Sequence, residues 1–314
     1  MELPILQIHY QSFRDEGEDG FAIVPDKDET LLCVTDGCGG LGSKRYADLQ
    51  NHTGAYIAAR LAARAFSEWV EQGFQWPETR DEEIRRCREA EHLLYQRLHQ
   101  FASQYCAQEN SRITGSMQRT LPTTLCAVTA RGNEACFWWA GDSRGYLLDG
   151  EGLRQYTKDH TRGNADAFES LYLDAPLTNM LSADKAGRIQ CRRVRLKQPC
   201  LVLVATDGVY NSLATPMELE MLLLDTLKQA TSMVKWQTVL SRRIAALAQD
   251  DATLLLLQTG DTEFEQLKNQ LLGRRERLKK QLITPVRRRK NDWHFAREKW
   301  LEYKQTYDCT EENE

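Results

Sequence analysis

The sequence predicts an α+β fold in which helices and β-structure form separate layers. Short apolar β runs come first, two helices follow, and then come many strands, further helices and one last strand. This order favours a layered architecture over a repeated βαβ unit. The two helices are amphipathic, so each is expected to cover a sheet or another helix. With 314 residues, 41% of them hydrophobic, the chain is long enough to bury a sizeable core.

The amino-terminal part of the chain predicts three strands and two helices. Apolar β runs predict strands at Leu6–Ser12, Phe21–Val24 and Leu31–Val34. Apolar residues then recur at helical spacing between positions 55 and 70, and again from Ile84 to Tyr105. Each of the two segments therefore has one apolar face.

From Thr123 onward the apolar pattern is typical of β-structure. The predicted strands are Thr124–Ala130, Ala135–Ala140, Gly145–Leu148, Leu153–Tyr156, Ile189–Leu196, Cys200–Thr206 and Ala252–Gln258. Two helices, near 216–227 and 231–248, are expected before the last strand. A polar, poorly periodic stretch separates the fourth and fifth of these strands.

The composition changes near residue 260, which predicts a domain over 1–260 and a charged helical extension over 261–314. Residues 268–290 of this extension carry ten basic residues and one acidic residue. Helices are expected at 262–282 and 291–305, with a break at Pro285 because proline disrupts helix interiors. The basic stretch is expected either to dock an acidic partner or to form a solvated helix face.

The overall composition excludes several classes of protein. A net charge of −4 argues against a surface built for nucleic acid. No apolar run reaches the length of a membrane-spanning helix, and the first residues do not resemble a signal peptide. The nine scattered cysteines, none in a Cys-x-x-Cys pattern, are typical of reduced thiols. We therefore expect a cytoplasmic monomer that binds neither nucleic acid nor membrane.

Acidic residues stand next to small residues where apolar runs end. They occur as Glu18-Asp19-Gly20, Asp36-Gly37, Gly141-Asp142, Asp207-Gly208 and Asp250-Asp251. A single Asp-Gly pair is most often a turn, but five such sites indicate carboxylates that converge at sheet edges. Carboxylates gathered without basic partners repel one another, and hard divalent cations with oxygen ligands relieve that repulsion.

Seven short motifs stand in an order and spacing that resemble those of the metal-dependent Ser/Thr protein phosphatases (PPM, type 2C), in a bacterial-like form. The motifs are Arg14-Asp-Glu-Gly-Glu18-Asp19, Asp36-Gly37-Cys38-Gly39-Gly40, Thr123-Thr124, Gly141-Asp142-Ser143-Arg144, Thr157-Lys-Asp159-His160, Thr206-Asp207-Gly208 and Asp250-Asp251-Ala-Thr253. The resemblance spans about residues 5–258.

The resemblance implies a central β-sandwich flanked by helical layers (α-β-β-α), with Mn²⁺ or Mg²⁺ bound at one end. The family's site holds two ions and a third ion that is bound more weakly. Asp36 would bridge the first two, with the Gly37 carbonyl and Glu18 on one ion and Asp207 and Asp250 on the other. Asp142 would hold the third ion together with Asp207.

The resemblance also implies roles for Arg14 and Asp19. Arg14 would grip the substrate phosphate, for which a planar guanidinium is well suited, and Asp19 would orient metal-bound water. Without the motif, Arg14 reads as a solvated charge paired with Asp15 or Glu16. Cys38 stands where the family usually has His or Met, which leaves protonation of the leaving group to metal-bound water or to His160.

Together these features predict a metal-dependent phosphatase that hydrolyses phosphoserine and phosphothreonine by attack of a water bridging two divalent cations. Its partners would be a phosphorylated protein substrate and a cognate Ser/Thr kinase or that kinase's target. Two alternatives stay open: a non-catalytic phosphoprotein-binding or scaffold module, and a hydrolase of a small phosphorylated metabolite.

Overall fold

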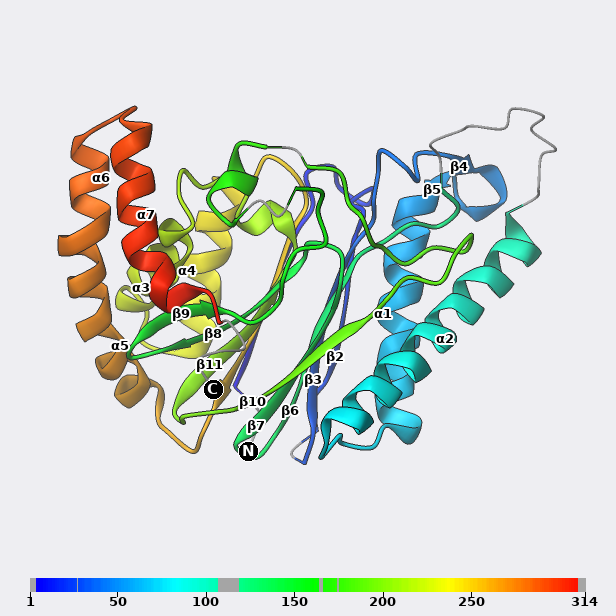
Figure 1. Cartoon of the computed structure of the whole chain (residues 1–314), viewed down its shortest axis with the longest axis horizontal. Helices are drawn as coiled ribbons and strands as arrows, with labels where there is room; N and C mark the ends of the chain where they lie inside the picture. The colour runs from blue at the N-terminus through cyan, green and yellow to red at the C-terminus, as the bar shows by residue number, and fades with distance from the viewer. Residues whose placement is uncertain (1–3, 27, 107–118, 164–165, 174, 310–314) are drawn as a thin grey trace.

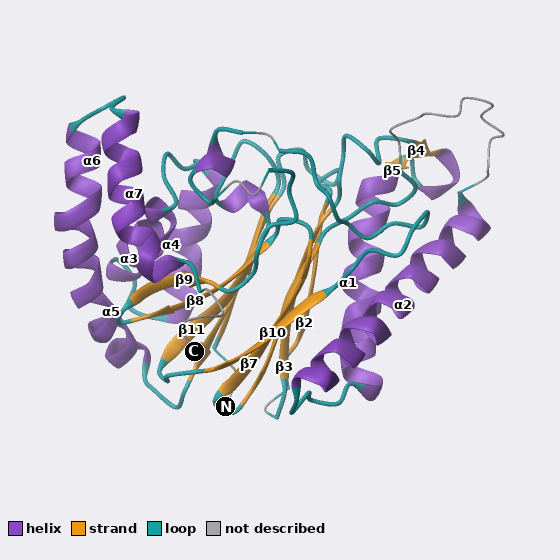
Figure 2. Cartoon of the chain, in the orientation of Figure 1, coloured by secondary structure: helices purple, strands orange, loops and turns teal. Residues whose placement is uncertain are grey.

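The chain folds into four layers, with helices on both sides of two packed sheets (Figures 1 and 2). The computed structural model describes residues 4–26, 28–106, 119–163, 166–173 and 175–309. Residues 310–314 of the predicted extension lie outside this part. The predicted α+β class and the α-β-β-α sandwich are both confirmed.

Two five-stranded antiparallel sheets form the sandwich. The first has the order β1-β12-β11-β8-β9 and the second the order β10-β7-β6-β3-β2. The strands are β1 (Ile5–Tyr10), β2 (Asp19–Val24), β3 (Thr30–Asp36), β6 (Leu125–Arg131), β7 (Glu134–Ala140), β8 (Arg144–Asp149), β9 (Gly152–Gln155), β10 (Gln190–Arg195), β11 (Cys200–Ala205) and β12 (Ala252–Thr259). A small hairpin of β4 (Arg45–Tyr46) and β5 (His52–Thr53), which the sequence did not predict, lies outside both sheets.

The central strands read as continuous apolar runs because both of their faces are buried. Along β3, Leu32 and Val34 point into the core between the two sheets, whereas Leu31 and Cys33 pack under the helices on the outer face. Successive side chains of a strand alternate between faces. Each strand therefore contributes to two hydrophobic layers at once.

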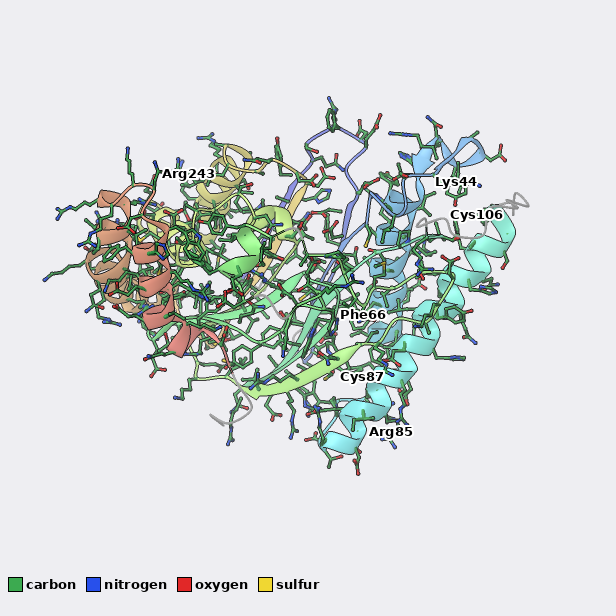
Figure 3. The ribbon with its side chains drawn as sticks, turned by 45° about the horizontal axis from the view of Figure 1, so that its top comes forward. Lys44, Phe66, Arg85, Cys87, Cys106 and Arg243 are labelled. Carbon is green, nitrogen blue, oxygen red and sulfur yellow. The ribbon has the colours of Figure 1, made fainter. Side chains whose placement is uncertain are left out.

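The outer face of the second sheet is covered by α1 (Gly54–Gly73) and α2 (Arg80–Tyr105). A stripe of alanines lets α1 approach the sheet closely: Ala55, Ala58, Ala59 and Ala62 are fully buried. Thr53 caps the start of α1 by accepting a hydrogen bond from the Tyr56 N–H. Phe66 of α1 is fully buried, whereas Arg85 of α2 points away from the molecule (Figure 3).

The outer face of the first sheet is covered by α3 (Met217–Lys228), α4 (Met233–Ala245), α5 (Phe264–Leu278), α6 (Thr284–Arg288) and α7 (Trp293–Tyr307). Trp236 of α4 and Trp300 of α7 are fully buried in one apolar cluster with α3 and α5. Residues of the predicted extension thus belong to this helical layer. The domain division at residue 260 stays a prediction.

The predicted helix break at Pro285 is wrong. A π-helical segment, Lys279–Ile283, joins α5 directly to α6, and Pro285 lies in the first turn of α6. Proline is tolerated there because the missing N–H is not needed in a first turn. The chain instead leaves the helix at Arg289, and Asp292 caps α7 by accepting a hydrogen bond from the Phe295 N–H.

Acidic residues of α3 neutralise part of the basic stretch. Arg274 contacts the buried Glu220 (N···O 2.6 Å) and Arg275 contacts Asp225 (2.5 Å). Arg287 pairs with Glu218 at 3.2 Å. These pairs hold the carboxyl-terminal helices on the domain, so the basic stretch is less available for an external partner than its sequence indicates.

The cysteines and the lengths of the apolar helices bear on two expectations from the composition. None of the nine cysteines forms a disulfide, in agreement with the prediction of reduced thiols. Within the described residues, no helix is both long enough and apolar enough to cross a membrane.

Candidate active site

The acidic motifs meet where strands of both sheets end. Asp19, the first residue of β2, lies directly opposite Asp36, the last residue of β3, in the antiparallel pairing. Asp142 follows β7, Asp207 follows β11, and Asp250 precedes β12. The sheet topology therefore gathers residues that are separated by up to about 230 positions in the sequence.

Two threonines fix the position of the Asp36-Gly37 turn. The Asp36 N–H donates to Thr124 Oγ1 (3.0 Å), and the Asp36 carbonyl accepts from Thr123 Oγ1 (2.9 Å) and from the Thr124 N–H (2.8 Å). With the backbone satisfied in this way, the Asp36 side chain is left to face its acidic neighbours.

Glycines let the Asp36-Gly37 loop approach Glu18 and α1. A Cβ on Gly37 would overlap the Ala55 backbone at the start of α1, and a Cβ on Gly39 would overlap Glu18 Oε2. Glu18 is further held by the Thr53 hydroxyl, which donates to Glu18 Oε1. Burial, followed by the charges of nearby acids, raises the pKa of Glu18 even though this hydrogen bond lowers it.

Asp19 is 2% exposed and lies between two threonine hydroxyls. Thr206 Oγ1 and Thr253 Oγ1 donate to the same oxygen, Asp19 Oδ2, at 2.8 and 2.6 Å. Burial raises the pKa of Asp19 to about 8 despite these two hydrogen bonds. Its other carboxylate oxygen is left for a further partner.

Asp36 and Asp207 are in direct contact. Burial, followed by the charges of Asp207 and other nearby acids, raises the pKa of Asp36 well above 3.8. Asn211 Nδ2 donates to Asp207 Oδ2 at 2.8 Å and so fixes the orientation of this carboxylate.

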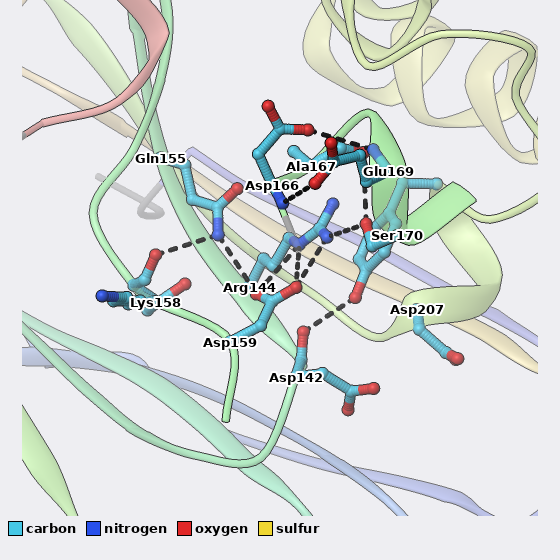
Figure 4. A network of polar contacts seen from close by, with 12 residues as sticks. Asp142, Arg144, Gln155, Lys158, Asp159, Asp166, Ala167, Glu169, Ser170 and Asp207 are labelled. Atoms are coloured by element: carbon cyan, nitrogen blue, oxygen red, sulfur yellow. Dashed lines mark hydrogen bonds and ion pairs between the residues drawn. The ribbon is translucent and has the colours of Figure 1, made fainter. Parts of the chain in front are cut away.

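Asp142 lies on the turn between β7 and β8, beside a buried ion pair (Figure 4). The Tyr210 hydroxyl donates to the Asp142 carbonyl at 2.7 Å. The turn requires Gly141, whose φ of +106° suits glycine. Burial and the charge of Asp207 raise the pKa of Asp142 to about 7, although the nearby Arg144 lowers it.

Asp250 and Asp251 play different parts. Asp250 is exposed, and its negative charge raises the pKa of Asp207. Asp251 is 8% exposed and accepts hydrogen bonds from the Ser12 N–H (2.8 Å) and the Glu18 N–H (2.6 Å). Asp251 therefore fixes the loop that carries Glu18.

The structure does not bring Arg14 to the carboxylates. Its side chain is 93% exposed and pairs with Asp15 at 3.6 Å. His160 is hydrogen-bonded at both ring nitrogens: Nδ1 accepts from the Gly141 N–H (3.1 Å), and Nε2 lies 3.0 Å from Gln190 Oε1. Burial lowers the pKa of His160, which favours a neutral ring that donates to Gln190.

Cys38 is not suited to nucleophilic chemistry. Burial, followed by the negative charge of Asp36 and its neighbours, raises the pKa of the Cys38 thiol well above its usual value. The thiolate is the reactive form, so this environment disfavours a cysteine-phosphatase mechanism at this loop.

The carboxylate oxygens of these acidic residues are the kind of ligand that hard divalent cations prefer. Among the described residues, no group of three or more His, Cys, Asp and Glu side chains is placed to hold a metal ion as it stands. Within the described residues, none of these acids lies within ion-pair distance of a Lys or Arg. Burial, followed by the charges of neighbouring acids, raises the pKa of Glu18, Asp19, Asp36, Asp142 and Asp207. Oxygen-only acidic donors of this kind suit Mn²⁺ or Mg²⁺.

A cavity of about 1240 Å³ lies beside this site. Its walls come from α2, β10 and the loop after β9, and include Arg144 and Asp159 but none of the predicted metal ligands. The cavity is therefore a neighbour of the carboxylate site and not the site itself.

Sequence reasoning missed several residues that support the site. Thr206, Thr253, Arg144 and Asp159 lie inside recognised motifs, but nothing in the motifs indicates that they hold Asp19 or form a buried ion pair. Thr53 and Tyr210 belong to no motif, because their contacts with Glu18 and Asp142 exist only after distant segments pack together.

Known proteins share the fold and the family pattern. A family profile described as Protein phosphatase 2C matches residues 14–263. A Mycoplasma genitalium protein with a provisional protein phosphatase name is 25% identical over 209 residues, which cover 63% of this chain and 74% of that protein.

Two solved structures show the same fold. The serine/threonine phosphatase Stp1 of Staphylococcus aureus superposes with a TM-score of 0.64 at 16% identity, covering 83% of this chain and 96% of that one. The serine/threonine phosphatase PstP/Ppp of Mycobacterium tuberculosis superposes with a TM-score of 0.59 at 18% identity, covering 82% and 99%. On the family match over four fifths of its length, the chain belongs to the protein phosphatase 2C family and is a protein-serine/threonine phosphatase.

Proposed function

We propose that this phosphatase hydrolyses phosphoserine and phosphothreonine in proteins by a metal-dependent reaction at the Asp36–Asp207 site. The observation that supports the proposal best is the convergence of buried carboxylates from both sheets, none of which forms an ion pair with a described Lys or Arg. Asp36, the Gly37 carbonyl, Glu18, Asp207 and Asp250 would hold two Mn²⁺ or Mg²⁺ ions. Asp142 would hold a third, weaker ion.

Bound divalent cations would supply an acidified water as nucleophile and would offset the charge of the phosphoryl oxygens. The chain's own residues prepare the site for them. Asp36 and Asp207 would bind the ions as carboxylates, and the hydroxyls of Thr206 and Thr253 hold the Asp19 carboxylate in a fixed orientation.

Phosphate binding by Arg14 stays a prediction. Because Arg14 is exposed and paired only with Asp15, it would have to leave that pair and turn toward the carboxylates when substrate binds. An exposed ion pair of this kind contributes little free energy, so such a movement costs little.

The test compares hydrolysis of p-nitrophenyl phosphate and of a phosphothreonine peptide, with Mn²⁺ and with EDTA. We expect Mn²⁺-dependent turnover on both substrates, and we expect Asp36→Asn and Asp207→Asn to abolish it. The matched control is Asp48→Asn, because Asp48 is an exposed aspartate on the 3₁₀ turn Ala47–Leu49. The control should keep wild-type activity.

A second readout does not depend on activity. Without metal, Asp36→Asn and Asp207→Asn each remove the cost of ionising one buried carboxyl group beside the other, so both variants should melt at a higher temperature than the wild type at a pH that ionises both groups. Turnover that persists in EDTA would refute the metal-dependent mechanism. Turnover of small phosphomonoesters without any on phosphopeptides would favour a metabolite hydrolase, and no turnover at all would favour a binding module.

A further inference from the structure

The carboxyl-terminal helix α7 contacts the turn Asp166–Ser170 next to the active site. Trp300 Nε1 donates to Asp166 Oδ2 at 3.0 Å, and Lys304 Nζ donates to the same oxygen at 2.9 Å. Arg297 pairs with Glu169 of the same turn at 2.9 Å. The indole ring of Trp300 also stacks on Phe168, with ring centroids 6.4 Å apart.

Asp166 joins this helix to the turn through its two oxygens. Asp166 Oδ1 accepts the backbone N–H groups of Phe168 and Glu169, each at 3.0 Å, while Oδ2 receives α7. The first oxygen shapes the turn and the second attaches it to α7. Separate substitutions can therefore break the attachment and leave the turn intact.

The Asp166–Ser170 turn also holds Arg144. Ser170 Oγ accepts from Arg144 Nη2 at 2.8 Å, and Asp159 accepts from Arg144 Nη2 at 2.7 Å and from Nε at 3.1 Å (Figure 4). Arg144 is 2% exposed and lies over the Tyr210 ring, 3.9 Å from its centroid. Tyr210 also donates to the Asp142 carbonyl. Tyr210 therefore contacts both the Arg144 guanidinium and the turn that carries Asp142.

A second contact from α7 reaches the Arg144–Asp159 ion pair through Gln155. The Tyr307 hydroxyl donates to Gln155 Oε1 at 2.9 Å, and Gln155 Nε2 donates to Asp159 Oδ1 at 3.2 Å. Both partners of Arg144, Ser170 and Asp159, are thus held by α7 through one intermediate residue each.

We propose that α7 positions the phosphatase centre: through Asp166 and Gln155 it fixes Arg144, and thereby the Gly141–Arg144 turn that carries Asp142. This helix lies outside residues 14–263, which match the family profile. The inference rests on the proposed role of Asp142. It assigns the carboxyl-terminal extension a positioning role inside the molecule, by contacts that are buried and directional.

The chain offers matched pairs of variants. Asp166→Asn keeps the oxygen that shapes the turn but presents an amide to Trp300 and Lys304, whereas Asp225→Asn breaks a comparable contact between Arg275 and α3. Tyr307→Phe removes the hydroxyl bound to Gln155. Tyr303→Phe removes a hydroxyl of the same fully buried type, which binds Glu220 instead.

The first readout is hydrogen exchange of metal-free protein, measured by mass spectrometry on peptides that cover residues 141–146. Asp166→Asn and Tyr307→Phe should exchange faster there, with no change in β6, while Asp225→Asn and Tyr303→Phe should match the wild type. The second readout is kinetic. Asp166→Asn and Tyr307→Phe should each lower kcat about tenfold and keep KM within about twofold of the wild type. The reason is that misplacing a catalytic group mainly affects the transition state.

Unchanged exchange at 141–146 in Asp166→Asn and Tyr307→Phe would overturn the inference, as would equal changes in the two control variants. Because exchange is measured without metal, it also separates the two proposals. If the wild type shows no Mn²⁺-dependent turnover but the exchange pattern is as expected, the metal mechanism fails and the positioning by α7 stands.

Discussion

The Asp159→Asn substitution provides a direct test of the buried ion pair beneath the active site. The Arg144 side chain is 2% exposed and that of Asp159 is 10% exposed, with N···O distances of 2.7, 3.1 and 3.2 Å between them. Asparagine keeps the shape of the side chain but removes its charge, so the guanidinium stays buried without a compensating anion. Breaking one partner of a buried pair costs about 3–5 kcal/mol.

For a chain of this size each kcal/mol lowers Tm by about 1.5 °C, so Asp159→Asn should lower Tm by roughly 5–8 °C. The assays are thermal unfolding, which gives Tm, and urea unfolding, which gives the free energy of unfolding; both use metal-free protein at neutral pH and are followed by circular dichroism. The control is Glu68→Gln, which removes an exposed pair with Arg64 (N···O 2.8 Å) and should cost less than about 1 kcal/mol.

A second variant keeps the test decisive. Replacing both partners, as in Arg144→Met with Asp159→Leu, removes the uncompensated charge and should recover at least half of the stability lost in Asp159→Asn, since apolar replacements of buried pairs are often tolerated. The reasoning is refuted if Asp159→Asn costs no more than Glu68→Gln, or if the double variant is less stable than Asp159→Asn alone.

Two further predictions concern the carboxylates. The pKa of Asp19 rises from 3.8 to about 8 on folding, so the native protein holds a proton that the unfolded chain has lost: this stabilisation is present below pH 3.8 and is lost as pH rises through about 8. The Tm of metal-free wild type relative to Asp19→Asn should therefore fall across this window, and Mn²⁺ should reduce the fall; a Tm difference that does not change with pH would contradict the shift. Gly39→Ala would displace the Glu18 carboxylate and should raise the Mn²⁺ concentration needed for half-maximal activity, whereas Gly40→Ala meets no atom within 4 Å and should leave it unchanged. Equal Mn²⁺ requirements in the two variants would argue against Glu18 as a ligand.

The local pattern of the sequence predicted most of the elements. Continuous apolar runs bounded by Asp-Gly turns mark strands such as β3 and β11, because such strands are buried on both faces and end where the chain reaches solvent. The helix α2 was predicted from Ile84 onward but begins at Arg80, because the Thr79–Glu82 capping box starts the helix there. Pro285 misled the prediction because its effect depends on its place in a helix turn, which the π-helical segment before it decides.

The acidic motifs alone indicated that carboxylates would gather, because five of them stand where apolar runs end. Which of them meet was decided by the pairing of β2 with β3 and by the packing of the two sheets, which place Asp19 opposite Asp36 and bring Asp207 onto Asp36. The supporting hydroxyls of Thr53 and Tyr210 carry no sequence signal, because a single threonine or tyrosine looks the same whether it faces water or a catalytic loop.

The role of the carboxyl-terminal segment was also decided by the tertiary structure. By itself the sequence determined a charged helical extension after residue 260, since charge and periodicity are local properties. Whether that charge faces solvent or a partner within the molecule depends on contacts between distant residues, such as Arg274 with Glu220 and Lys304 with Asp166. These contacts form only when α5 and α7 pack against the first sheet, and the free energy of burying the apolar faces of those helices brings the charged groups together.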